Sequence, residues 1–560
     1  MKHWSWLFVC FLLALSLVLS GCQTTGETSE TTSDPAEDVS SGDETSSGDT
    51  SSGDTDNVGG NTPANWSKFD LDTSWKGSDT FLRCSGGSVD MEGGGATFAS
   101  GKLSITKSGT YILSGNLEGQ IYIKVDEAEK VHLVFNGFSL SCADYSPLYC
   151  EEADKLSITL ADGTENSVTD NGSGYVQGTD SGNGRFAGAI HVKSSLTVNG
   201  SGSLAVTSSY RHGIVSNKNL RIVSGKVTVK AVEDGVKGKN SLSMLDGTLN
   251  VTAGGDGLKV TEEKKEDRGY LTVEGGDITV EAGGDGLDVP RLIQITGGTV
   301  RVTSIDHALR CKDAVKIGGN AVLGLSADSG KKDSDAKGIK ADGDVEISGG
   351  TLRVLRSFEG IESKNGSVRI TGGHIEIDAS DDGINAETLI EISGGYLFIR
   401  ASGDGLDSNS DIVFSGGTTV VQGPTSNGDG PLDCGDREGS VIRTTGGVLI
   451  AYGSAGEAKY PDGASSTQYA MGYIVMLRKG IVYSLRDADG NAVCTFKALQ
   501  DAQSLCISTP DMKNGGTYTL YEDAQPTGNA TNGYYADPSS TGGDEVLSFT
   551  VSSMVSTDKE

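Results

Sequence analysis

One short pattern of residues repeats along the middle of the chain, from about Gly225 to Gly447. A typical copy, LTVEGGDITVEAGGDGLDV at 271–289, has an alternating run that ends in Gly-Gly, a second alternating run, and then Asp-Gly-Leu-Asp. Most copies stand 21 to 23 residues apart, and three longer steps contain the polar inserts EEKKEDR, SGKKDSDAK and SNGDGPLDCGDRE. A fixed period of this size predicts a solenoid.

Each copy offers two or three short strands whose residues alternate between inside and outside, with no helical periodicity. The glycine doublets mark corners, where positive φ or close backbone approach is needed. We therefore predict an all-β chain that forms a right-handed parallel β-helix, with one coil of about 22 residues per repeat and coils about 4.8 Å apart. The corner glycines are Gly225 (in a Ser-Gly pair), Gly247 (in an Asp-Gly pair) and the second glycines of eight Gly-Gly doublets, namely Gly276, Gly298, Gly319, Gly350, Gly373, Gly395, Gly417 and Gly447.

The first 21 residues read as a lipoprotein signal peptide. Lys2 precedes an apolar run that is short for a spanning helix, and Leu19-Ser20-Gly21-Cys22 resembles a bacterial lipoprotein box. That resemblance implies lipid on Cys22 and a chain exported and anchored to the outer side of a bacterial cell membrane. An ordinary signal peptide with an incidental cysteine is the alternative.

Three further segments follow the signal. Residues 22–65 are rich in Ser, Thr, Gly and acidic residues, lack Lys and Arg, and are predicted to be a disordered tether. Residues 66–450 are predicted to form the β-helix, beginning with less regular coils that cap its first edge. In residues 451–560 the period is lost, and we expect a small C-terminal β cap with a hairpin at Asp489-Gly490.

Charge and cysteine content limit the function classes. A formal net charge of −31 argues against a nucleic-acid ligand, which selects basic surfaces. Seven cysteines follow Cys22, an odd number without metal-type CxxC pairs. Export permits disulfides, so Cys142/Cys150 and Cys494/Cys506 are candidate pairs, whereas Cys311 fits a buried free thiol equally well. Nothing in the sequence fixes the oligomeric state.

Aligning the copies produces two columns of polar residues. The first lies nine residues after the second corner glycine, and the second lies three residues further on. The first column contains Asp234, Asp256, Asp285, His307, Asp328, Glu359, Asp382 and Asp404, and inserts shift its motif to Lys337 before Glu359 and to Asp429 after Gly417. The second column contains Lys237, Lys259, Asp288, Arg310, Lys340, Glu362, Asn385, Asp407 and Asp433.

The columns are strongly acidic in the later coils. Equivalent positions in a β-helix stand about 5 Å apart, and like charges in register repel. Seven carboxylates gather there with Asp381 beside them and no basic residue in either column: Glu359, Glu362, Asp382, Asp404, Asp407, Asp429 and Asp433. Protonation could offset the repulsion, but Ca²⁺, which takes six to eight oxygen ligands, does so better. Asp256, Asp285 and Asp288 form a smaller cluster. For any single aspartate, Asp-Gly turn chemistry explains the residue as well.

Basic side chains separate the two acidic clusters. His307, Arg310, Lys337 and Lys340, with Lys312 nearby, could pair with Asp288 and Glu362, or could bind an anionic sugar polymer that an acidic protein would otherwise repel. In a lyase, Lys340, Lys337 or Arg310 would serve as the base that removes the proton α to a uronate carboxylate. No motif selects one of the three.

The run from about Ser100 to Thr445 resembles the bacterial surface proteins described as carbohydrate-binding-domain-containing proteins. The resemblance rests on GTYILSGNL, VHLVFNGFSL, SITLADGTENSVTD, AIHVKSSLTVNGSGSLAVTS, HGIVSNKNLRI, VEDGVKGKNSL and the SGG…DG(I/L) copies. It implies a calcium-binding right-handed β-helix similar to family 9 polysaccharide lyases. It also implies binding of plant cell-wall polysaccharide, polygalacturonate or cellulose. The implied calcium ligands are Asp256, Asp285, Asp288, Glu359, Glu362, Asp382, Asp404, Asp407, Asp429 and Asp433, whereas His307 replaces the usual Asp.

These observations predict a non-catalytic, cell-surface polysaccharide-binding lipoprotein with Ca²⁺ at its corners. Two alternatives stay open. One is a calcium-dependent pectate lyase. The other is a surface adhesin, which the low aromatic content of 6% favours over a binder of flat crystalline cellulose.

Overall fold

The computed structural model describes residues 66–172, 188–330, 335–426, 428–435 and 437–558. They lie within one compact unit, Asp54–Glu560. The predicted signal peptide, the lipidation site Cys22 and the tether to residue 65 lie outside the described residues. Among the described residues, no helix is long and apolar enough to cross a membrane.

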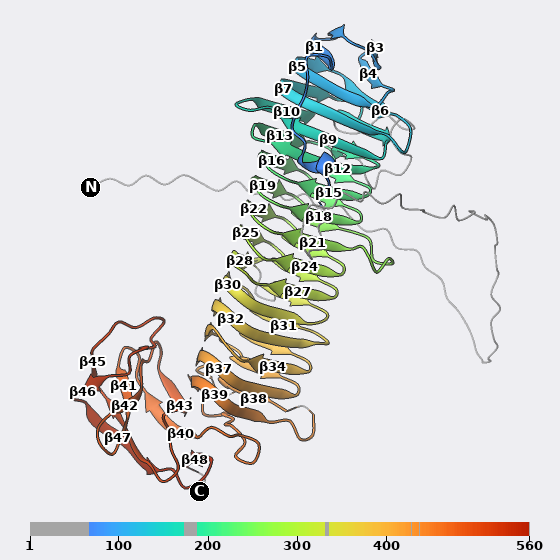
Figure 1. Cartoon of the computed structure of the whole chain (residues 1–560). Coiled ribbons are helices and arrows are strands. Elements are labelled where there is room, and N and C mark those ends of the chain that lie inside the picture. The colour runs from blue at the N-terminus through green and yellow to red at the C-terminus, as the bar shows by residue number, and fades with distance from the viewer. Residues whose placement is uncertain (1–65, 173–187, 331–334, 427, 436, 559–560) are drawn as a thin grey trace, which may run out of the picture. The chain divides into compact units, whose positions relative to one another are not determined.

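Each repeat forms one coil of a parallel β-helix, which confirms the predicted fold. A coil has three strands, for example β24 (Leu292–Ile295), β25 (Thr299–Ser304) and β26 (Leu309–Cys311). Each strand pairs in parallel with its equivalents in the neighbouring coils, so that Ile293 lies between Leu271 and Val315. We name the three outer surfaces face A, face B and face C, in the order in which a coil visits them; Figure 1 shows their strands stacked in chain order.

Face C carries the site described below. Its 15-stranded sheet is parallel except at β3, which pairs antiparallel with β4. Its strands are β3 (Ala96–Ala99), β4 (Lys102–Ile105), β6 (Gln120–Lys124), β8 (Leu148–Glu152), β11 (Gly188–Val192), β14 (His212–Ser216), β17 (Val236–Gly238), β20 (Leu258–Val260), β23 (Leu287–Val289), β26, β29 (Ile339–Ala341), β31 (Ile361–Ser363), β33 (Ile384–Ala386), β36 (Leu406–Ser408) and β38 (Leu432–Cys434).

Faces A and B belong to one 27-stranded sheet, because several strands bend around the glycine corner without a break. Strands on both faces are β5 (Gly109–Glu118), β7 (Lys130–Cys142), β30 (Val345–Arg356), β32 (Ser367–Asp378), β37 (Asp411–Gln422) and β39 (Ile442–Gly453). Face A also has β9 (Lys155–Leu160), β12 (Ser195–Gly200), β15 (Asn219–Ile222), β18 (Ser241–Met244), β21 (Tyr270–Val273), β24, β27 (Ala314–Ile317) and β34 (Leu389–Ile392). Face B also has β10 (Glu165–Asp170), β13 (Ser203–Ser208), β16 (Lys226–Ala231), β19 (Thr248–Ala253), β22 (Asp277–Ala282), β25, β28 (Val322–Ala327) and β35 (Tyr396–Arg400).

The two kinds of corner glycine are needed for different reasons. All ten corner glycines that the repeat predicted, Gly225 to Gly447, have positive φ, between 60° and 96°. The glycine of the Asp-Gly corner lacks positive φ and is required for space instead. At Gly286, a Cβ atom would lie 2.1 Å from Val302 Cγ1 and 2.5 Å from the Ala308 carbonyl oxygen. The chain therefore turns onto face C only by pressing its backbone against the next coil.

Both ends of the coil stack are covered by antiparallel pairing. At the first end, β1 (Thr80–Gly86) folds back on β2 (Ser88–Glu92). At the other end, β43 (Ala502–Ser508) pairs antiparallel with β39 and β40 (Ala470–Leu477), and β48 (Val555–Thr557) joins β40. A four-stranded sheet completes the predicted C-terminal cap: β41 (Val482–Asp487), β42 (Ala492–Lys497), β44 (Thr517–Glu522) and β47 (Asp544–Thr550). Its apolar residues share one core cluster with face B residues of the last coils, such as Phe398 and Ile450. The strands β41 and β42 form the expected hairpin at Asp489-Gly490. The pair β45 (Gln525–Pro526) and β46 (Ser540–Thr541) lies between β44 and β47 in the chain.

The first described residues do not start the coil stack but cross its side. The short helix α1 (Lys68–Leu71) is closed by a capping box between Ser67 and Asp70. Asp70 is fully buried and reaches Lys155 and Thr197 on face A. We call residues 66–72 the strap; it contacts coils more than 80 residues further along the chain.

None of the seven described cysteines is in a disulfide bond, so neither candidate pair is joined in this structure. Cys311 is a buried thiol of the stack, as one of the two interpretations expected. Burial raises its pKa to about 12, which makes it unreactive as a thiolate.

Candidate functional site

The first column forms a ladder of hydrogen bonds between coils at the entrance to face C. The backbone N–H of Asp256 donates to Asp234 Oδ1 at 3.2 Å, and that of Asp285 donates to Asp256 Oδ1 at 2.9 Å. The same bond joins Asp404 N–H to Asp382 Oδ1 at 2.7 Å. Each side chain thus satisfies a backbone donor that the turn leaves without a strand partner. This hydrogen bond is the physical reason for an aspartate before the corner glycine. Aligning the repeats showed the aspartates but not the backbone groups to which they bond.

The structure confirms one of the first-column positions next to an insert and shows that two others were assigned wrongly. Lys337 does belong to it, because its N–H donates to His307 Nδ1 at 3.2 Å, whereas Asp328 lies outside and pairs with Arg356. Asp429 does not belong to it: Gly430 N–H donates to Asp404 Oδ1 at 2.7 Å. An insert changes the number of residues between the corner glycine and the first column. The first-column residue is therefore found by counting back two residues from the start of the next strand of face C.

The second column is confirmed throughout. Its residues occupy the middle, outward position of the three-residue strands of face C, between two buried residues. The cross-strand partners run Lys237, Lys259, Asp288, Arg310, Lys340, Glu362, Asn385, Asp407 and Asp433 in unbroken sequence. The two columns therefore lie side by side along one edge of face C.

In the earlier coils, ion pairs offset the charges of the columns. Lys259 bridges Asp256 and Asp288, with Nζ 2.8 Å from Asp288 Oδ2. Arg310 Nη1 lies 3.2 Å from Asp285 Oδ2. Asp256 and Asp288, two of the predicted calcium ligands, thus share a lysine. Aligning the repeats placed Lys259 in the second column but did not show that it lies between Asp256 and Asp288.

The middle of the columns holds a buried lysine. The side chain of Lys337 is 3% exposed, and its Nζ lies 2.6 Å from Glu359 Oε1 and 3.0 Å from Asp335 Oδ1. Burial opposes its charge, but the bonds to Glu359 and Asp335 and the charge of Glu362 outweigh burial and raise its pKa. Lys340 lies 3.6 Å from both Asp335 and Glu362. The predicted pairing with Glu362 is therefore observed.

The acidic surplus is concentrated in the next coils. Asp381, Asp382 and Asp404 have no ion pair within 4.0 Å among the described residues. Carboxylate oxygens of Glu359, Asp381 and Asp382 all lie within 4.8 Å of one another. Glu359 Oε2 is buried and has no hydrogen-bond partner in the described chain. Asp433, at the far end, pairs with Lys459 of the C-terminal segment, a partner that sequence analysis missed.

The environment raises the pKa values of these carboxyls. Burial, opposed by Lys337, raises the pKa of Glu359 to about 7. Burial and the charge of Asp381 raise that of Asp382 to about 6. For Asp404, burial is again the largest cause, and its pKa reaches about 7. These crowded carboxyls therefore hold protons more tightly than usual, and their oxygen atoms are the kind of ligand that a hard divalent cation takes.

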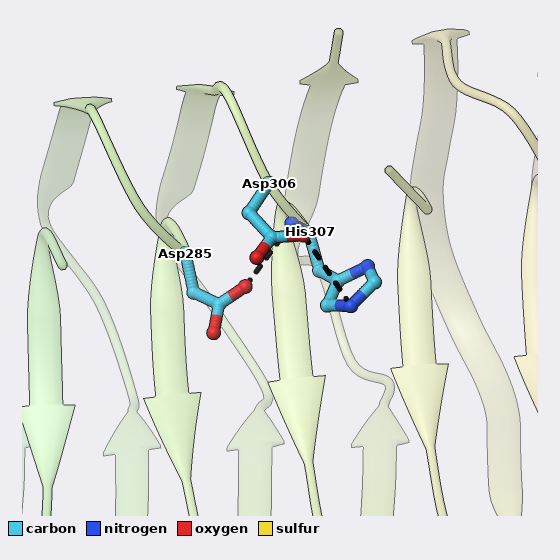
Figure 2. Close-up of side chains that lie close together, drawn as sticks. All are labelled: Asp285, Asp306 and His307. Atoms are coloured by element: carbon cyan, nitrogen blue, oxygen red, sulfur yellow. Dashed lines mark hydrogen bonds and ion pairs between the residues drawn. The ribbon is translucent and has the colours of Figure 1, made fainter. Parts of the chain in front are cut away.

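A second group of ligand atoms includes a histidine (Figure 2). The backbone N–H of His307 donates to Asp285 Oδ1 at 3.1 Å, and the ring atom His307 Nε2 lies 3.5 Å from Asp306 Oδ1. Burial lowers the pKa of His307 to about 4, so the ring is neutral, and its Nδ1 replaces an aspartate oxygen in the hydrogen-bond ladder. Burial and the charges of Asp256 and Asp288 raise the pKa of Asp285 to about 7. The sequence had identified Asp285 and His307 but not Asp306.

A small hollow of about 200 Å³ lies on face C beside this group. It is lined by Lys259, Asp288, Arg310 and Lys312, and the insert at residues 262–268 contributes Glu263. Lys312 pairs with Glu263 across it. The polar insert therefore forms a wall of this hollow, which we call the basic hollow.

The raised carboxyl pKa values predict how stability changes with pH. A carboxyl whose pKa is raised on folding stabilises the fold below its unfolded pKa and loses that contribution as pH rises through the folded pKa. The buried histidines His307 and His191 have lowered pKa values and act oppositely, but only between about pH 4 and 6.5. Without divalent cations, we expect the melting temperature to fall between pH 6.5 and 8, by the equivalent of roughly 2 kcal/mol. Calorimetry in chelator measures this, and a flat profile would contradict the carboxyl assignments.

Comparison with known proteins agrees with the resemblance seen in the sequence. A family model described as carbohydrate-binding domain-containing protein matches residues 99–383 and 357–472. A protein of the same description from Acetivibrio thermocellus is 30% identical over 138 residues, which is 24% of this chain and 48% of that protein. The match thus spans about half the relative's length.

One solved structure is also similar to part of the chain. It is a polysaccharide lyase-like protein from C. thermocellum, determined as a gadolinium derivative, with 29% identity and a TM-score of 0.42. The match covers 43% of this chain and 99% of that one. Since the family model spans most of the coil stack, this protein belongs to the carbohydrate-binding domain-containing family.

Proposed function

We propose that this protein is a non-catalytic, cell-surface binder of acidic polysaccharide, with polygalacturonate as the ligand class and Ca²⁺ as its cofactor. The observation that carries the proposal is an acidic cluster with more carboxylates than cations. Lys337 pairs with Glu359, whereas Asp381, Asp382 and Asp404 have no ion pair within 4.0 Å among the described residues. The cluster lies on the same edge of the stack as Arg310 and Lys340. Cellulose, which the resemblance in the sequence also implies, is the neutral alternative.

Calcium and the basic residues would act together on such a ligand. A chain with a net charge of −31 repels a polyanion unless the contact surface is locally neutralised. A cation held by Glu359, Asp381 and Asp382 would remove the repulsion within the cluster. These three supply fewer oxygens than Ca²⁺ takes, so coordination positions would be left for water, backbone carbonyls or a uronate carboxylate.

The surroundings of the lysines favour binding over lyase chemistry. A general base must be neutral and within reach of the substrate. Lys337 is almost fully buried and its pKa is raised, which supports a structural role for it. Arg310 and Lys340 each lie beside carboxylates as ion-pair partners. All three predicted bases thus serve to neutralise the columns in this proposal.

The proposed location rests on the sequence. Acylation of Cys22 would anchor the chain to the outward side of the bacterial cell membrane, with more than one acyl chain giving stable attachment. The acidic segment at 22–65 would then lift the β-helix away from the surface.

Calorimetric titration of the full chain with polygalacturonate tests the proposal. We expect binding in Ca²⁺ that weakens at least tenfold in excess chelator, with no rise in absorbance from unsaturated products. Equal binding in chelator would overturn the role of calcium, and product formation would make the protein a lyase. Absence of binding in both conditions would remove the uronate ligand and favour an adhesin that recognises protein.

A further inference from the structure

The insert at residues 262–268 separates two hollows of different character. One is the basic hollow on face C described above. The other, on the face A side, has a volume of about 460 Å³ and is lined by Arg268, Tyr270, Arg291, Leu292 and Ala314, with acidic residues at its rim. It contains no member of either column, and neither the repeat pattern nor the carboxylate cluster accounts for it.

The floor of this second hollow is an outward-facing apolar strip. Tyr270, Leu292 and Ala314 are cross-strand partners in three successive coils. Their inward neighbours, such as Ile293, are fully buried in the core, so alternation directs the three side chains outward. In the preceding coils the same position is Ser241 and Asn219. An aromatic ring followed by two apolar residues on an outer surface favours a contact with something other than water.

A mixed polar rim surrounds the strip. Arg291 Nη2 makes only a long bond, 3.4 Å, to the Glu263 carbonyl oxygen. Its Nε is buried and has no hydrogen-bond partner among the described residues. The Nη2 end of the guanidinium, held by this one long bond, is the part that can donate to a ligand oxygen. Arg268 and three carboxylates, those of Glu266, Asp267 and Asp313, complete the rim.

The two hollows differ in the sign of their local charge. Around Tyr270, three carboxylates face two guanidinium groups. In the basic hollow, Lys259, Arg310 and Lys312 face two carboxylates. The hollow around Tyr270 would therefore repel a uronate, and the basic hollow would attract it. The hydroxyls of a neutral sugar would find both hydrogen-bond donors and acceptors around Tyr270.

We infer that the hollow around Tyr270 is a subsite for a neutral pyranose unit whose equatorial substituents leave one flat face of C–H groups. That face packs on the electron-rich face of the Tyr270 ring, and the hydroxyls bond to Arg291 and the rim carboxylates. The inference rests on the proposed polysaccharide-binding function and extends its ligand to a polymer containing both neutral and acidic sugars. The 262–268 insert stands between the two subsites.

Titrations of the full chain with cellohexaose, xylohexaose and an oligogalacturonate test the subsite. We expect Tyr270→Ala to weaken binding of at least one neutral oligosaccharide about tenfold or more, and Tyr270→Phe to keep most of the affinity, because the ring face makes the contact. Oligogalacturonate binding should stay within about twofold of wild type in both variants. Lys312→Ala, on the other side of the insert, should show the opposite preference. Tyr210→Ala, which removes a tyrosine elsewhere in the stack, is the aromatic control, and unchanged melting temperatures confirm folding.

The outcomes separate this inference from the proposed function. If the neutral probes bind to wild type with Tyr270 dependence and oligogalacturonate does not bind, the subsite stands and the uronate ligand fails. If oligogalacturonate binds but neither neutral probe does, or if Tyr270→Ala leaves neutral binding unchanged, the subsite is overturned and the proposed function stands. If no probe binds, both are overturned.

Discussion

In calcium-free buffer at pH 8, the Asp382→Asn variant is expected to melt at a higher temperature than the wild type, and calcium is expected to add little to it. The amide oxygen can still accept the Asp404 N–H, which donates to Asp382 Oδ1 at 2.7 Å in the wild type. The substitution removes one negative charge from a cluster with Glu359 and Asp381. The variant therefore keeps the hydrogen-bond ladder and loses a metal ligand.

Two further substitutions distinguish the ladder from the cation site. Asp382→Ala loses both the ladder bond and the ligand, so it should melt below Asp382→Asn in every buffer. Asp234→Asn is the matched control in the same column, because Asp234 already pairs with the buried Lys237 at 2.8 Å. Removing that partner charge should destabilise the fold with or without calcium. If Asp382→Asn keeps the full response to calcium in thermal melts, Asp382 is not a ligand.

Replacing Asp70 by alanine is expected to destabilise the folded chain by about 3 to 5 kcal/mol, the typical cost of breaking a buried ion pair. Asp70 is fully buried, 3.2 Å from Lys155 Nζ and 3.9 Å from Arg221 Nε. Burial works to raise its pKa, but the charges of Arg221 and Lys155 and the bond from Thr197 outweigh it and hold the pKa below 3.8. Alanine would leave both cations without their carboxylate and release the strap.

Thermal melts and limited proteolysis of the strap measure this effect. Leu71→Ala, at an exposed neighbouring position of α1, is the control and should change stability little. Asp70→Asn should lie between the two, since it can keep hydrogen bonds but not the charge. Equal melting temperatures for Asp70→Ala and Leu71→Ala would show that the strap contributes nothing to the stack.

The coil architecture could be predicted because each coil corresponds to one copy of the sequence repeat. Every doublet glycine with positive φ was visible as a repeat, and so was the second column, since one residue per coil faces outward on each short strand. Stacking turns a sequence period directly into a line of neighbours in space. Where an insert broke the period, at Asp429, counting from the glycine failed and the buried strand decided the register.

Contacts without a period could be decided only by the tertiary structure. Asp70 of the strap pairs with Lys155, and Lys459 pairs with Asp433. No sequence pattern relates the partners of either pair. The ladder of Asp side chains bonds to backbone N–H groups, which carry no sequence signal. The hollow around Tyr270 arises because the insert at residues 262–268 projects from a corner of the coil next to face A. The sequence determined the coils and the positions of their charges, whereas the three-dimensional packing determined which charges are neutralised and which stay available to a ligand.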